Sequence, residues 1–454
     1  MIGRKGTHEL MTPPVLKPLV MVALLTILGG TGAVSFALEE KSLSGGQPEL
    51  RLSLRDAMQA SVDQNPTVLL FKERITQAQD QADTQLGELL PNLSANMSWA
   101  RRRFFLSTFG GSPSVSAPRD FYGTRAFLTQ NLFSLSLIHK WRAARTNVEV
   151  AGLDAEITQQ DTMATVGLVY LETLRAKAAV HAREADVTLN NELLRLARER
   201  KSAGMATSLD VTRARVQLEN EKQRLLVAQN AHDRGTLTLI RAIGLPFEIR
   251  LVLTDELTLR AVPKQPTKEA LAIAKENRVE LKAQKRRERL AALTLSSVTS
   301  ERIPSLIGSG DVGLTGNQIS DALTTDNVQV LLSIPIFDGG QREGRISESR
   351  SLVRQESIRT RDVHYQIALE VRDALLTLES TQQQIGVAEE GLRLALEELE
   401  LARQRFAVGV ATNIEVTNAQ TSVAQARDNL IEALFNFNAS RVDLARAQGR
   451  LQDL

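Results

Sequence analysis

The chain has 454 residues, with 55 basic and 53 acidic side chains, no cysteine and only 4% aromatic residues. This near-neutral charge gives no argument for nucleic acid or another polyanion as a partner. The lack of cysteine excludes disulfides and thiolate metal sites. Long stretches rich in Ala, Leu, Gln, Arg and Glu favour extended helices over ordinary globular domains.

The first 37 residues have the features of a secretory signal peptide. Arg4 and Lys5 precede an apolar run at 19–28, and a small-residue site ends at Ala37. We therefore expect residues 1–37 to be removed on export. A retained membrane anchor is the alternative, but the apolar run is short for a spanning helix. Removal of these residues leaves equal numbers of basic and acidic side chains.

The rest of the sequence consists of two tandem halves. RKSAGMATSLDVTRA at 200–214 and RFAVGVATNIEVTNA at 405–419 align without gaps, and similar segments flank both in the same order. Such a repeat indicates duplication and a pseudo-twofold chain. The expected elements are a first repeat at 38–244 (strands about 91–106 and 120–133, helices about 137–199 and 208–243, tip 200–208), an equatorial linker at 245–266, and a second repeat at 267–454 (strands about 304–316 and 327–337, helices about 340–404 and 413–449, tip 405–413).

Each half contains two segments that alternate between apolar and polar residues. In 92–99, for example, Leu93, Ala95, Met97 and Trp99 alternate with Asn and Ser. About ten residues of this pattern are typical of tilted outer-membrane strands. Only closed barrels of at least about eight strands satisfy their backbone groups in lipid. A chain with four strands must therefore assemble with copies of itself, as a dimer with eight strands or a trimer with twelve.

The long helices carry a coiled-coil repeat. From Ile367 to Phe406, apolar or small residues recur at alternating spacings of four and three. This 3.5-residue period predicts left-handed supercoiling against a neighbouring helix. The helix would be on the order of 100 Å long at 1.5 Å per residue. Periodicity alone would also fit a soluble coiled-coil rod, so the alternating segments decide the fold class.

The two tips between the long helices carry the same helix-ending and helix-starting signals. A glycine suited to the left-handed conformation ends the first helix. A threonine followed three residues later by an acid reads as a capping box for the next helix. A capping acid at a tip can also line whatever the tips enclose. The residues concerned are Gly204, Thr207 and Asp210 in the first tip and Gly409, Thr412 and Glu415 in the second.

Other motifs have a structural explanation. Gly308-x-Gly310-x-x-Gly313 matches a dinucleotide fingerprint, but it lies in an expected strand and no helix follows it. The histidines are isolated on helices, so we expect no metal site, no cofactor and no enzyme activity. Arg101, Arg102 and Arg103 are expected either at a solvated rim or in contact with lipopolysaccharide phosphates.

The sequence resembles the TolC-like outer-membrane efflux proteins. The resemblance depends on the tandem halves, on the strand–helix junctions at 131–133 and 335–340, and on an R-x-x-x-G-x-A-T pattern in both tips. It implies a homotrimer in the outer membrane of a Gram-negative cell. Three chains would form a twelve-stranded β-barrel continuous with a twelve-helix periplasmic α-barrel, and segments 38–51 and 245–266 would form an equatorial collar.

The resemblance also implies roles for tip residues. The tips would dock a periplasmic adaptor protein that links to an inner-membrane pump, and they would constrict the tunnel entrance. Phe406 stands where a tethering tyrosine often occurs, and Ala411 and Asn418 depart from the family pattern, so one acidic ring is expected rather than two. The implied gate residues are Asp210, Glu415, Asn418 and Phe406, and the implied docking residues are Arg200, Gly204, Thr207, Arg405, Gly409 and Thr412.

These features predict a passive exit duct of a tripartite efflux system. An outer-membrane channel for type I protein secretion would use the same architecture, so the sequence leaves that alternative open. A periplasmic coiled-coil structural or adaptor protein is the alternative from a different class. It would need one hairpin rather than two, and it would not need four strands of membrane length.

Overall fold

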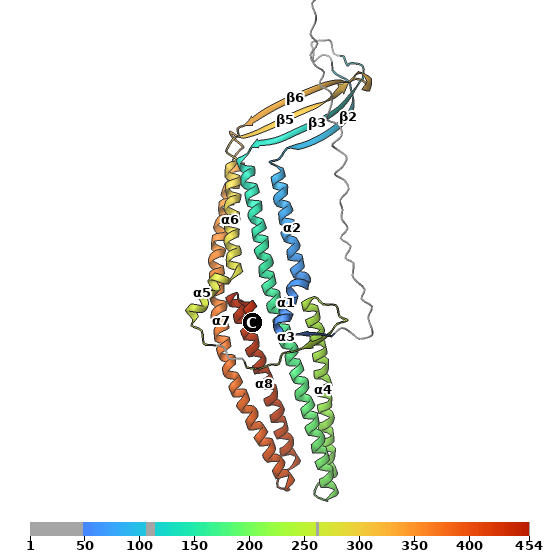
Figure 1. The fold of residues 1–454 in the computed structure, drawn as a ribbon, viewed down its shortest axis with the longest axis vertical. Helices are drawn as coiled ribbons and strands as arrows, with labels where there is room; N and C mark the ends of the chain where they lie inside the picture. Colours follow the sequence, from blue (N-terminus) through green and yellow to red (C-terminus); the bar gives the residue numbers. More distant parts are fainter. Residues whose placement is uncertain (1–48, 106–113, 260–262, 454) are drawn as a thin grey trace, which may run out of the picture. The chain divides into compact units, whose positions relative to one another are not determined.

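A computed structural model describes residues 49–105, 114–259 and 263–453, which all fall within one unit, Gln47–Leu454. The expected signal peptide at 1–37 lies outside the described residues. Both halves of the chain follow the same order of elements, which confirms the tandem repeat (Figure 1). The first half has α1 (Leu54–Gln64), α2 (Pro66–Gly87), β2 (Asn92–Arg102), β3 (Arg119–Phe133), α3 (Leu135–Ser202) and α4 (Ser208–Ile243), and the second has α5 (Thr267–Asn277), α6 (Val279–Ser300), β5 (Ser305–Gly316), β6 (Leu323–Ser333), α7 (Gln341–Ala407) and α8 (Asn413–Gln448).

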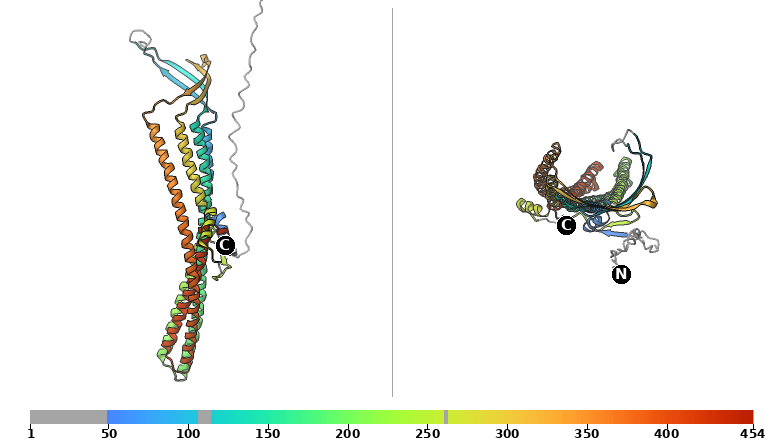
Figure 2. Two further views of the ribbon diagram at one scale, coloured as in Figure 1. Left: turned by 90° about the vertical axis from the view of Figure 1, so that its left-hand side faces the viewer. Right: turned by 90° about the horizontal axis from the view of Figure 1, so that it is seen from above.

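Within this unit the four long strands lie beyond one end of α3 and α7, and the α3–α4 and α7–α8 turns lie at the other end (Figures 1 and 2). The helices α3 and α7 have 68 and 67 residues, so each is on the order of 100 Å long. No helix in the described part of the chain is both long and apolar enough to cross a membrane.

The four long strands form one antiparallel sheet in the order β2-β3-β5-β6. Paired residues share a face of the sheet, because side chains alternate along each strand. Leu93, Met97 and Trp99 therefore share the face of their partners Leu128, Thr124 and Tyr122. The opposite face carries polar residues from all four strands, among them Asn96, Arg125, Asp311, Thr325 and Asn327. In an outer-membrane barrel the apolar face contacts lipid and the polar face lines the lumen.

The last strand differs from the sequence expectation of 327–337. It begins four residues earlier, at Leu323, and ends at Ser333. Pro335 lacks the backbone N–H that a ladder requires, so the strand stops before it. Gly339 and Gly340 then adopt positive φ angles of 71° and 84°, which turn the chain into α7.

The coiled-coil seam of α7 is confirmed. Of the twelve positions predicted between Ile367 and Phe406, ten are buried and two, Ala388 and Leu392, are half-buried. The seam packs mainly on α8, where Phe437 is fully buried. A second core surrounds Tyr170 of α3, which packs with Met58, Leu239 and Ile243 from the shorter helices.

The equatorial segments come together in a short parallel sheet, in which β1 (Glu49–Leu52) pairs with β4 (Arg250–Leu253). The hydroxyl of Tyr170 lies 3.0 Å from both the Leu52 carbonyl oxygen and Asp255 Oδ2. Burial, and secondarily the charge of Asp255, raises the pKa of this phenol well above its usual range. Tyr170 therefore remains a neutral link between α3 and both equatorial segments.

Candidate functional site: the hairpin tips

The first part of each tip has the same backbone geometry. Gly204 and Gly409 have φ angles of 73° and 84°, in the left-handed region that their sequence positions predict. The N–H of the following residue donates back to the carbonyl of Arg200 at 2.8 Å in the first tip and of Arg405 at 3.0 Å in the second. This six-to-one bond is the Schellman arrangement, which satisfies carbonyl groups at the end of a helix.

The second part of each tip differs. In the first tip, the predicted capping box is present: Asp210 N–H donates to Thr207 Oγ1 at 3.3 Å, and Asp210 Oδ2 accepts from Thr207 N–H at 2.9 Å. The Thr207 hydroxyl also donates to Asp210 Oδ2 at 2.7 Å, and this bond, together with the one from the Thr207 N–H, lowers the pKa of the Asp210 carboxyl. In the second tip, Thr412 makes no side-chain capping bond, so the predicted box of Thr412 and Glu415 is wrong.

Glu415 is instead directed toward the preceding helix. Its Oε2 lies 3.5 Å from Arg405 Nη2, and both side chains remain about half exposed. Glutamate is one methylene longer than aspartate, so its carboxylate can reach the last turn of α7. Glu415, Asn418 and Arg405 border one groove of about 520 Å3 between α7 and α8.

Arg200 joins the two tips. Its guanidinium lies 4.2 Å from the ring centroid of Phe406, and its Nη1 donates a hydrogen bond to the Phe406 carbonyl oxygen. Arg200 and Phe406 are 9% and 6% exposed, so this contact is largely shielded from water. Cation–π contacts strengthen when they are desolvated. Phe406 therefore has a tethering contact without a hydroxyl, through its ring and backbone.

A buried layer of charge links the same two hairpins farther from the tips, this time between α3 and α8. Asp186 of α3 is 4% exposed and accepts from Arg183 at 3.0 Å and from Arg427 of α8 at 2.6 Å. Arg183 also bonds to Asp428 of α8. Glu221 of α4 lies nearby, and burial raises its pKa. Sequence analysis missed this layer, although a charged residue within the coiled-coil stretch of α3 is a signal that could have indicated it.

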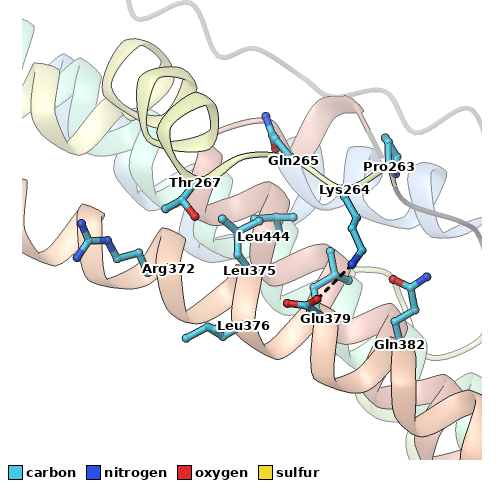
Figure 3. Close-up of a pocket in the computed structure, with 11 residues that line it drawn as sticks. Pro263, Lys264, Gln265, Thr267, Arg372, Leu375, Leu376, Glu379, Gln382 and Leu444 are labelled. Atoms are coloured by element: carbon cyan, nitrogen blue, oxygen red, sulfur yellow. Dashed lines mark hydrogen bonds and ion pairs between the residues drawn. The ribbon is translucent and has the colours of Figure 1, made fainter.

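The remaining motifs do not form a second site of this kind. Gly308, Gly310 and Gly313 lie inside β5, and a Cβ on Gly313 would come 2.2 Å from the Thr124 carbonyl oxygen, so close strand packing explains that glycine. Within the described ranges, no group of three or more His, Asp or Glu side chains could hold a metal ion. A cavity of about 420 Å3 beside α7 is lined by leucines and by polar and charged residues, among them Lys264, which pairs with Glu379 at 3.3 Å (Figure 3).

Comparisons with known proteins establish the family. The profile of the outer membrane efflux protein family matches residues 57–245 and 270–450, so the chain belongs to that family. The chain is 21% identical to the outer membrane protein TolC of Escherichia coli over 95% of this chain and 87% of TolC. It is 22% identical to the pyoverdine export outer membrane protein OpmQ of Pseudomonas aeruginosa over 89% and 85%. Its fold matches the Campylobacter jejuni CmeC outer membrane channel with a TM-score of 0.75 and 16% identity, over 88% of this chain and 86% of that one.

The expected fold class is thereby confirmed. The described residues of one chain contain four long strands in one sheet and two long helical hairpins, the fold of the solved outer membrane channel. The protein is an outer-membrane efflux channel component, and its family consists of channels rather than enzymes. The gap between the two matched segments, 246–269, contains β4 and the chain that leads into α5.

Proposed function

We propose that the protein is the exit duct of a tripartite efflux system and that it conducts small molecules passively from the periplasm to the exterior. A periplasmic adaptor would dock at the hairpin tips and link the duct to an inner-membrane pump, which would supply the energy. The observation that carries this proposal is the contact between the tips, where Arg200 of the first hairpin holds Phe406 of the second.

The Arg200 contact supports a closed resting arrangement that an adaptor can release. Gly204 and Gly409 are exposed beside it. Because glycine has no side chain, a docking helix could approach the backbone of both turns closely. A partner shifts an equilibrium only through better contacts with one of the states. We propose that the adaptor binds better to tips in which Arg200 has left Phe406.

Glu415 would set the charge at the periplasmic entrance. Three copies of this carboxylate in one narrow opening would attract cations and repel anions. Arg405 lies 3.5 Å away and reduces that field. We propose a single ring formed by Glu415, with Asn418 one helical turn farther along α8 as a neutral neighbour.

The absence of cysteine permits a direct test of docking. Ser202→Cys and Val408→Cys introduce single thiols at exposed positions in the two tips, and Leu226→Cys introduces one at an exposed position on α4 away from the tips. Each thiol would be labelled with a photoactivatable crosslinker in living cells. We expect an adduct with a periplasmic adaptor from both tip variants and not from the α4 control. Equal adducts from all three sites, or none from the tips, would contradict docking at the tips.

A further inference from the structure

Two arginines lie directly opposite each other at the outer end of the first hairpin of strands. Arg102 of β2 is the register partner of Arg119 of β3, and both side chains are exposed. Directly opposed residues in an antiparallel pair have Cβ atoms about 4.5–5.5 Å apart, and like charges there repel. The described residues give neither arginine an ion pair or a side-chain hydrogen bond.

The strand register assigns this pair to the lumen face. Arg102 and Arg119 share the face of Asn96 and Arg125, the polar side of the sheet. Arg101 and its partner Asp120 share the opposite face, with Trp99 and Tyr122, and lie 3.9 Å apart. The three consecutive arginines therefore do not act as one cluster, because strand alternation separates Arg101 from Arg102.

No carboxylate on the lumen face of the described strands is available to compensate the pair. Asp311 is the acid on that face, and it is bonded to Arg125. Asp321, in the turn Ile319–Asp321 between β5 and β6, accepts from the Gln318 N–H at 2.7 Å. The loop residues 106–113 contain no charged residue in the sequence.

An aromatic pair lies beside the arginines. The rings of Phe104 and Phe121 meet edge to face with their centroids 5.9 Å apart, and Phe121 shares the lumen face with Arg119. This contact fixes the chain on both sides of the arginine pair, since Phe104 follows Arg102 by two residues and Phe121 follows Arg119 by two. The two guanidinium groups are thus presented on an ordered part of the rim.

We propose that Arg102 and Arg119 form an anion-binding ring at the exterior end of the duct, which favours the exit of anionic solutes. Three chains place six guanidinium groups around one lumen, and such a ring raises the local concentration of anions. Guanidinium groups bind carboxylates and phosphates through paired hydrogen bonds. This inference depends on the proposed duct. It assigns the exterior end a charge opposite to that of the Glu415 ring.

The matched control is one residue away. Arg102→Gln/Arg119→Gln removes two charges per chain from the lumen face, whereas Arg101→Gln removes one charge from the lipid face of the first strand. Reversal potentials would be recorded in a KCl gradient across planar bilayers free of lipopolysaccharide. Each variant would be measured with native tips and with Arg200→Ala, which lowers the resistance of the periplasmic end. Heat-modifiable migration on gels would verify that each variant forms trimers.

We expect the double variant to lower the chloride-to-potassium permeability ratio by at least about twofold, while Arg101→Gln leaves the ratio unchanged. Current with an unchanged ratio in both backgrounds would overturn the anion ring but not the duct. The recordings would be repeated with lipopolysaccharide added to the bilayer. A change in the ratio that occurs only after this addition would also overturn the anion ring, because the arginines would then bind lipid phosphates. A complete lack of current in every variant would overturn the duct, and this inference with it.

Discussion

The two hairpin tips have nearly the same sequence pattern and the same helix-ending turn, but they use their acids differently. Asp210 caps its own helix, whereas Glu415 pairs with Arg405 of the preceding helix. One additional methylene separates the two outcomes, since the longer side chain can leave the backbone that the shorter one caps. A duplicated sequence therefore provides one tip whose acid caps its own helix and one whose acid pairs with the preceding helix.

The largest effect is expected at the buried charge layer that joins the two hairpins, and its measurement tests how much this layer contributes to stability. Asp186→Ala leaves Arg183 and Arg427 without their shared carboxylate. Removing one partner from a buried ion pair costs about 3–5 kcal/mol. We expect a loss of this order in the free energy of unfolding, measured by urea denaturation in detergent. Glu192→Ala, at an exposed ion pair on the same helix, should change it by about 1 kcal/mol or less. Similar losses in the two variants would contradict the layer's role.

Arg200→Ala tests the contact between the tips. It removes a charged hydrogen bond and a shielded cation–π contact, which together correspond to about 2–4 kcal/mol. We expect the tips to separate more readily and the single-channel conductance to rise. Arg195→Ala, an exposed substitution on α3, is the control. Unchanged conductance in Arg200→Ala would show that this contact does not restrict the entrance.

Substitution of the two threonines should break the symmetry between the tips. Thr207→Ala removes a capping bond and should destabilise α4 by about 1 kcal/mol. Thr412→Ala removes no capping bond and should have little effect. Hydrogen exchange in the first turns of α4 and α8 would measure both. Equal loss of protection in the two helices would mean that the second tip is capped as well.

The same comparison predicts a pH dependence for the first tip. Hydrogen bonds hold the pKa of Asp210 below the value for an unfolded chain, so its stabilising contribution is present above the unfolded pKa. That contribution is lost as the pH falls through the lower folded value. We therefore expect protection of α4 to weaken below about pH 4 in the wild type. The Asp210→Asn variant should lack this dependence, and an identical pH profile would contradict the assignment.

The smallest structural effect should come with a clear change in selectivity. Glu415→Gln and Arg405→Gln each break an exposed ion pair worth about 0–1 kcal/mol. Glu415→Gln should reduce the preference for cations in single-channel recordings, and Arg405→Gln should increase it. Shifts in the same direction, or no shift in either, would leave Glu415 without a role at the entrance.

Much of the fold follows from local sequence patterns. The seam from Ile367 to Phe406, the left-handed glycines and the first capping box were predicted because each depends on residues that are close together along the chain. The end of β6 was mispredicted because apolar alternation continues through Ile336, although Pro335 has already ended the ladder. The second capping box was mispredicted because its motif does not specify which partner a longer acid will choose.

The sequence by itself determined the helical hairpins, the four strands and the need for several chains, since periodicity and chain length fix which faces must be buried. Only the tertiary structure decided which charges meet. Arg200 contacts Phe406 across 206 residues, and Arg427 contacts Asp186 across 241. It also showed, through strand register, that Arg101 and Arg102 face opposite sides of the sheet. Such pairings depend on how distant segments pack, and no local pattern encodes them.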